Sequence, residues 1–340
     1  MRLRIMYLDS LAIIIAFART LSASFLNQIP FPAPPPNSDI HLAINPTCGQ
    51  LSGDTADLNA GIDKHSIKTI VSFGASSSFY FYEQPSLNVR TGQLHRRCPL
   101  AGGRSTNGLT WVENVANDLN ATIKDYAQAG ACIDLNLWPS NPRKIDFLGQ
   151  MKTFLGQNNA LDPNTTLYSI FFGINDYLAS LIDGDHLAEA AQVLLDQIKI
   201  LASPPTNARK FMVLDVYGRG ITIPSGEAYK QIIYSGLSSF RVNGIQIDDQ
   251  HDQRNVTLDI SYINFANIWE GVLGPNPGFE KFGYVSEDAC TKCTAELGCT
   301  TIGICDDPEH YFYWIPGHPS KETMRIMADY VREVWDQCRV

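Results

Sequence analysis

The chain has 340 residues, enough for one large domain or two small ones, and its 44% hydrophobic and 18% charged residues are typical of a globular protein. Its formal net charge of -9 argues against nucleic acid or an anionic membrane as a partner, because no basic face could outweigh that background. One short basic cluster, at residues 95–97, is interpreted as a solvated loop.

The first residues have the pattern of a secretory signal peptide. Arg2 and Arg4 precede an apolar run at residues 11–18, and small residues follow that run. The run is well short of the ~20 residues that a membrane-spanning helix needs. We therefore expect residues 1–23 to be a signal peptide and the protein to be secreted and extracellular. Residues 24–43 form a proline-rich N-terminal segment, which we expect to be an extended linker.

Beyond residue 67, apolar runs alternate with amphipathic ones. The expected strands span residues 67–73, 122–126, 166–172, 211–216 and 258–264. The expected helices span residues 109–119, 144–155, 186–201, 228–247 and 323–335. This alternation is typical of crossover units, in which a parallel sheet carries helices on both faces. It predicts one α/β domain at residues 44–340, with a cysteine-rich insert near residues 275–305.

Cysteines and glycosylation sequons agree with export. All eight cysteines follow the signal segment, and their even number suits up to four disulfides: Cys48, Cys98, Cys132, Cys290, Cys293, Cys299, Cys305 and Cys338. Cys290, Cys293, Cys299 and Cys305 are spaced closely enough to resemble a zinc site. Because no ligand histidines lie near them, disulfides are favoured there. Sequons at Asn120, Asn164 and Asn255 fit the same secretory route.

Three segments carry the residue types that a serine hydrolase needs. Ser76 follows the first expected strand, Asn175 follows the third, and His318 lies just before the last helix. A serine hydroxyl needs a base to take its proton, histidine has a suitable pKa, and the oxyanion that forms needs donors aimed at it. Ligands of parallel sheets bind outside the carboxyl ends of the strands, so Ser76 and Asn175 should share one rim. The Gly-x-Ser-x-Gly elbow of another hydrolase type is absent from this stretch.

These segments resemble the GDSL (SGNH) hydrolase superfamily, and more narrowly its secreted fungal carbohydrate esterases and acetylesterases. The family's first block, usually Phe-Gly-Asp-Ser, corresponds to Phe-Gly-Ala-Ser at residues 73–76. Its second, usually Asn-Tyr-Ala-x-Gly-Gly-Ala, corresponds to Asp-Tyr-Ala-Gln-Ala-Gly-Ala at residues 125–131. Its third, Gly-x-Asn-Asp, is intact at residues 173–176, and its fifth, usually Trp-Asp-x-x-His-Pro-Thr, corresponds to Trp-Ile-Pro-Gly-His-Pro-Ser at residues 314–320. The resemblance spans roughly residues 44–338 and implies a flavodoxin-like three-layer α/β/α fold with a parallel sheet.

The resemblance also implies roles for individual residues. Ser76 would be the nucleophile and His318 the general base, while the backbone N–H groups of Ser76 and Gly130 and the Asn175 amide would form the oxyanion hole. The expected reaction is hydrolysis of short-chain carboxylic esters through an acyl-serine intermediate, without a metal or an organic cofactor. The narrower resemblance suggests acetyl esters on plant-wall carbohydrates, so the expected partner is a small-molecule or oligosaccharide ester substrate. We expect the protein to be a monomer.

Two positions depart from the family pattern. Ala75 stands where the family has an acidic residue beside the nucleophile, and Ile315 stands where it has the aspartate that orients the histidine. Losing that aspartate costs on the order of 10^4 in kcat in other triads. A main-chain carbonyl near residues 314–316, or Asp306 or Asp307, could accept the histidine N–H in its place.

Other interpretations of the same residues stay open. Ser76 and Asn175 are also suited to capping helices, His318 to stiffening a turn, and Gly130 to close packing. Beside the short-chain esterase, we therefore keep two alternatives. One is a lipase-like esterase for lipid esters, and the other is a catalytically impaired homologue that binds glycans.

Overall fold

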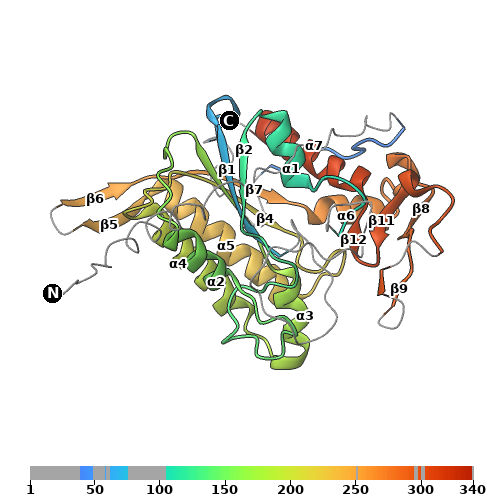
Figure 1. Cartoon of the computed structure of the whole chain (residues 1–340), viewed down its shortest axis with the longest axis horizontal. Helices are drawn as coiled ribbons and strands as arrows, with labels where there is room; N and C mark the ends of the chain where they lie inside the picture. The colour runs from blue at the N-terminus through green and yellow to red at the C-terminus, as the bar shows by residue number, and fades with distance from the viewer. Residues whose placement is uncertain are drawn as a thin grey trace, which may run out of the picture. The chain divides into compact units, whose positions relative to one another are not determined.

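The central sheet has the strand order β2-β1-β3-β4-β7, with every neighbouring pair parallel (Figure 1). The structure is a computed structural model that describes residues 39–48, 58, 62–75, 105–249, 252–294, 298–299 and 303–338. The sheet strands are β1 (Thr69–Gly74), β2 (Thr122–Asp125), β3 (Thr166–Phe171), β4 (Lys210–Asp215) and β7 (Asp259–Asn264). Numbered along the chain, these strands have the order 2-1-3-4-5 of flavodoxin-like sheets. The predicted fold class is confirmed.

Helices cover both faces of this sheet. On one face lie α1 (Trp111–Asp118), α6 (Ala266–Leu273) and α7 (Lys321–Gln337), and on the other lie α2 (Phe147–Gly156), α4 (Leu187–Ala202) and α5 (Pro224–Val242) (Figure 1). The short helix α3 (Ile174–Asp183) follows β3 directly and contacts α4.

Each strand serves two apolar cores because successive side chains point to opposite faces. In β3, Tyr168 and Ile170 pack with the helices of one face, while Leu167 and Phe171 pack with those of the other. All six β3 residues are buried, as expected for an interior strand of a parallel sheet.

The carboxyl ends of β1 and β3 lie side by side. Gly74, the last residue of β1, pairs with Phe171, the last residue of β3, and the Ala75 N–H donates to the Phe171 carbonyl at 3.1 Å. Strand order reverses between these two strands, which is where ligands bind in open parallel sheets. The segments that follow β1 and β3 therefore leave the sheet at the rim where the sequence predicts a site.

The predicted helix at residues 228–247 is wrong at its C-terminal end. Helix α5 stops at Val242, and Gly244 follows with φ +77°, a conformation that continues no helix. Beyond it, β5 (Ile245–Asp249) pairs with β6 (Asp252–Val256) as an antiparallel hairpin. The apolar alternation of this stretch belongs to a strand rather than to the last turn of a helix.

The region that contains the predicted insert forms short elements. These are the strands β8 (Ser286–Ala289), β9 (Cys293–Thr294), β10 (Gly298–Cys299), β11 (Tyr311–Ile315) and β12 (His318–Pro319), and the 3-10 turns η2 (Phe279–Phe282) and η3 (Pro308–His310). A further 3-10 turn, η1 (Lys64–Ser66), precedes β1. The three-stranded sheet β12-β11-β8 connects this region to the turn that carries His318.

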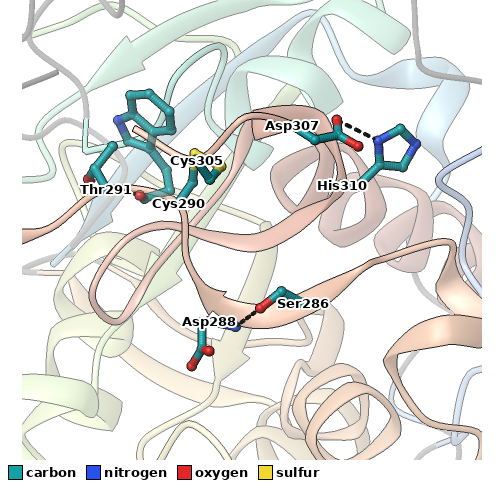
Figure 2. Close-up of a disulfide and its surroundings, with 8 residues drawn as sticks. Ser286, Asp288, Cys290, Thr291, Cys305, Asp307 and His310 are labelled. Carbon is teal, nitrogen blue, oxygen red and sulfur yellow. Dashed lines mark hydrogen bonds and ion pairs between the residues drawn. A yellow bond between two sulfur atoms is a disulfide. The ribbon is translucent and has the colours of Figure 1, made fainter. Parts of the chain in front are cut away.

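Two disulfides lie within the described residues. Cys48 is bonded to Cys338. Figure 2 shows the other, between Cys290 and Cys305. Cys290 and Cys305 are two of the four cysteines whose spacing resembles a zinc site, and they form a disulfide instead. Cys132 is a buried free thiol, so the expected upper limit of four disulfides is too high. Cys98 lies outside the described residues, as do the expected signal peptide and most of the proline-rich segment.

No helix among the described residues is long and apolar enough to cross a membrane. The asparagines of the three sequons, Asn120, Asn164 and Asn255, are all exposed. Their positions are therefore compatible with glycosylation.

Candidate active site

A pocket of about 410 Å³ lies where β3 and β4 end. Gly130, Asn175 and His318, which come from three distant parts of the sequence, all line it. Its remaining described lining residues are Trp111, Ser140, Asn141, Pro142, Arg143, Phe171, Ile174, Leu178, Ala179, Ile182, Val216, Arg219, Trp269, Pro316, Gly317, Pro319, Met324 and Met327. The structure therefore brings together three of the four residues predicted for catalysis, whereas Ser76 lies outside the described residues.

Asn175 lies in the first turn of α3, immediately after β3. Gly173 precedes that helix with φ +117°, which lets the chain turn sharply from strand to helix. The Asn175 side-chain amide donates to the Ala131 carbonyl at 2.9 Å. An amide nitrogen carries two hydrogens, so the second can serve an oxyanion. The partial positive charge at the start of α3 favours negative charge at the same place.

Gly130 holds a conformation that a larger residue could not adopt easily. Its φ is +78°, and a Cβ built there would lie 2.5 Å from Arg143 Cδ. Its carbonyl accepts a bond of 3.0 Å from the Asn141 side chain, whereas its N–H has no acceptor among the described residues. A backbone donor of this kind, on the wall of a pocket, is suited to bind an oxyanion.

His318 is held by the backbone of its own turn. Its Nδ1 lies 3.1 Å from the Pro316 carbonyl oxygen. A carbonyl only accepts, so Nδ1 carries the hydrogen and the neutral ring keeps its lone pair on Nε2. The expectation that a main-chain carbonyl near residues 314–316 accepts the histidine N–H is confirmed. Ile315 is buried in an apolar cluster with Cys290 and Trp314, so that side chain supplies no acceptor.

The alternative acceptor Asp307 has another partner. Its carboxylate lies 2.8 Å from Nδ1 of His310 within the turn η3, as Figure 2 shows beside the Cys290–Cys305 disulfide. The hypothesis that Asp307 orients His318 therefore has no support in the structure.

The pKa of His318 is lowered to about 4, chiefly because the ring is buried; the bond to Pro316 opposes this shift, and the nearby Arg219 guanidinium adds to it. A general base must be neutral to accept a proton. We therefore expect kcat/KM for an aryl acetate to rise with pH through a midpoint near 4 and then to stay level up to neutral pH. An ordinary histidine would place this midpoint near about 6.5. A pH profile of kcat/KM distinguishes the two, and a midpoint near that ordinary value would contradict the described environment.

The end of β1, two residues before Ser76, is clamped by a residue that the sequence did not single out. The Gln150 side chain accepts from the Gly74 N–H at 3.0 Å and donates to the Gly74 carbonyl at 2.9 Å. A Cβ at Gly74 would lie 2.8 Å from the Phe171 carbonyl oxygen, so glycine is needed for this approach. Gln150 thus stabilises the strand end beside Ala75, at the position where the resemblance leads us to expect a carboxylate. Its sequence signal is a single polar residue on the buried face of a predicted helix.

The Asp176 carboxylate forms hydrogen bonds with two segments that contribute residues to the pocket. One carboxylate oxygen accepts from the Ile133 N–H at 2.8 Å and from the Trp138 ring N–H at 2.7 Å, and the other accepts from the Gly173 N–H at 3.2 Å. Complete burial raises the pKa of Asp176 to about 6 against the effect of these donors. The carboxyl group therefore joins the loop after Gly130 to the turn that starts α3.

The fold and this pocket define a class of protein. A parallel α/β sheet holds a neutral histidine, a side-chain amide and a backbone N–H around one pocket at the carboxyl ends of its strands, which is an arrangement suited to a hydrolase. Among the described residues, no group of three His, Cys, Asp or Glu side chains is placed to hold a metal ion.

Comparisons with known proteins agree with this class. The chain is 22% identical over 250 residues to a GDSL esterase/lipase of Arabidopsis thaliana, a match that covers 65% of this chain and 62% of that protein. It is 27% identical over 92 residues to a second GDSL esterase/lipase of the same plant, covering 24% of this chain and 25% of that protein. The chain thus matches less than two thirds of the length of either relative.

These two distant relatives support the resemblance to the GDSL superfamily. No protein-family model matches the chain. A solved structure that aligns over 82% of this chain and 100% of its own has 14% identity and a TM-score of 0.39. The narrower resemblance to fungal carbohydrate esterases stays a prediction.

Proposed function

We propose that the protein is a serine esterase that hydrolyses short-chain carboxylic esters, with acetyl esters of plant-wall carbohydrates as the substrate class to test first. The observation that carries this proposal is the meeting of His318, Asn175 and Gly130 in one pocket. The similarity to two proteins named GDSL esterase/lipase supports the reaction class.

In this proposal each residue has a defined task. His318 Nε2 takes the proton of the Ser76 hydroxyl as its oxygen attacks the ester carbonyl, and later returns the proton to the leaving alkoxide. The Gly130 N–H and the second Asn175 amide hydrogen bind the oxyanion, together with the Ser76 N–H. Water then hydrolyses the acyl-serine by the same steps in reverse.

A lipase-like function is the second candidate, because helix α3 presents apolar side chains beside the pocket. Leu178 and Ile182 line it and are 44% and 76% exposed, and Leu181 next to them is 66% exposed. Single exposed apolar residues are ordinary, but two that line a pocket, with a third beside them on the same helix, are suited to a longer acyl chain. A lipase-like enzyme would prefer medium-chain aryl esters to aryl acetate.

We also propose that the protein is secreted. Disulfides persist in oxidising compartments and are rare in the cytosol, and the two within the described residues support export. Sequencing the N-terminus of the protein from culture medium tests this. A start after about residue 23 supports a cleaved signal peptide.

The deciding experiment compares the wild type with Ser76→Ala. A fluorophosphonate probe should label the wild type at Ser76 and leave the variant unlabelled, and aryl acetate hydrolysis should fall to the buffer rate in the variant. Equal hydrolysis by both proteins would overturn the serine mechanism. Saturable glycan binding without hydrolysis by either protein would instead support the impaired homologue.

A further inference from the structure

Arg219 is a pocket residue that the proposed mechanism does not use. It lies in the segment between β4 and α5 with φ +47°, a left-handed conformation that costs a non-glycine residue free energy. Its guanidinium donates to the Gly317 carbonyl at 2.7 Å. Burial lowers the pKa of Arg219. The chain thus keeps a partly buried cation where the backbone itself would favour glycine.

The charge of Arg219 has no protein counter-ion among the described residues. No described carboxylate forms an ion pair with it, and its bond to Gly317 uses a neutral acceptor. A guanidinium has five N–H donors in a planar fork that matches a carboxylate. The pocket's described lining includes Arg143 as a second cation but no Asp or Glu side chain. Burying an uncompensated charge is costly, and an anion bound in the pocket would offset that cost.

An anion bound to Arg219 would also affect the neighbouring His318. His318 becomes an imidazolium during the reaction, and the Arg219 charge disfavours that form. At residue 315 an isoleucine replaces the carboxylate that would compensate the imidazolium. A carboxylate bound to Arg219 would cancel the guanidinium's effect and supply negative charge to the same pocket.

We propose that Arg219 is a carboxylate-binding residue, and that the preferred substrate is an ester whose molecule also carries a carboxylate. This inference rests on the proposed esterase function and names the substrate class of that site. The carboxylate can belong to the alcohol part or to the acyl part of the ester, and both present the same chemistry to the guanidinium.

Matched substrate pairs test the proposal. For the alcohol side, para-acetoxybenzoate is compared with the neutral para-acetoxybenzamide. For the acyl side, the para-nitrophenyl monoester of adipic acid is compared with para-nitrophenyl hexanoate. We expect kcat/KM to be about tenfold higher for the anionic member of at least one pair, the size of one charge-assisted hydrogen bond. The pair that shows the preference identifies the side that carries the carboxylate.

Variants separate binding of the anion from support of the turn. Arg219→Gln should bring the ratio of the two kcat/KM values close to one, and Arg219→Lys should keep part of it. Because the ratio is taken within one variant, any loosening of the His318 turn cancels. Arg254→Gln is the control, since Arg254 is exposed on β6 and bonds the Asn207 side chain. A preference that survives Arg219→Gln, or its absence in the wild type for both pairs, would overturn the inference.

The same design distinguishes failure of the inference from failure of the proposed function. Hydrolysis that depends on Ser76 but ignores substrate charge overturns the inference alone. If no ester is hydrolysed, calorimetric titration with the inert amides para-acetamidobenzoate and para-acetamidobenzamide decides the inference. About tenfold tighter binding of the anion by the wild type, lost in Arg219→Gln, supports it. Equal binding of the two amides overturns it.

Discussion

Replacing Gly317 with alanine should lower kcat for an aryl acetate about 100-fold, because it displaces the turn that holds His318. Gly317 has φ +71°, and a Cβ there would fall well inside van der Waals contact of Arg219 Nη1. Either the turn shifts or the guanidinium leaves the Gly317 carbonyl. In both cases the Pro316 carbonyl, which fixes the His318 tautomer, loses its position.

A matched control separates this local effect from the general cost of alanine at a positive φ. Gly303 has φ +77°, and a Cβ there would meet nothing within 4 Å. Gly303→Ala should therefore cost a similar ~1–2 kcal/mol of backbone strain and leave kcat unchanged. Steady-state kinetics and thermal unfolding of both variants give the comparison. Equal kcat values for the two variants would show that the turn does not orient the base.

The carboxylate of a catalytic triad has two tasks in other enzymes, and the backbone of this protein is placed to perform one of them. It fixes the histidine tautomer, and it compensates the imidazolium. Here the Pro316 carbonyl performs the first task. The second has no protein carboxylate among the described pocket residues, since Ile315 is packed against Trp314 and Cys290. An anionic substrate would fill that second task.

The alternation of apolar runs predicted the architecture well, because parallel strands are buried on both faces. The expected strand at residues 166–172 is β3, and that at residues 211–216 is β4 to within one residue at each end. Helix α3 is not among the expected helix ranges, although Asn175 is also considered as a helix cap. It follows β3 almost without a loop, and its exposed Leu181 and Ile182 blur the apolar periodicity that marks a buried helix face.

The site could be predicted only in part, because some of its bonded residues lie far from their partners in the sequence. Asn175 and His318 were found because each lies in a recognisable motif beside a strand or a helix. Gln150 bonds Gly74 across 76 residues, and Arg219 bonds Gly317 across 98 residues. Nothing local marks such pairs, because only the folded sheet brings their segments together. The residues that support the pocket were therefore missed, although three of the pocket's candidate catalytic residues, Gly130, Asn175 and His318, were named from their motifs.

Removing the Asp176 carboxylate should lower the free energy of unfolding by about 3–5 kcal/mol, because it leaves buried donors without an acceptor. Asp176 is fully buried and accepts three N–H bonds, from Ile133, Trp138 and Gly173. The folded Asp176→Ala variant should also have a lower kcat. Asn175 and Gly130 lie on the two segments that this carboxylate joins, and they would lose their relative positions without it. Urea unfolding measures the first effect, and kcat of the folded variant measures the second.

The same helix offers the control that shows whether burial decides the size of this effect. Asp183, at the end of α3, also accepts from an N–H, that of Ser140 at 3.0 Å, and from the Ser140 hydroxyl at 2.7 Å, but it is only half-buried. Water can replace its bonds, so Asp183→Ala should cost about 1 kcal/mol. A similar cost for both variants would mean that the Asp176 donors find other acceptors. In that case the carboxylate would not be what holds the Gly130 loop against the start of α3.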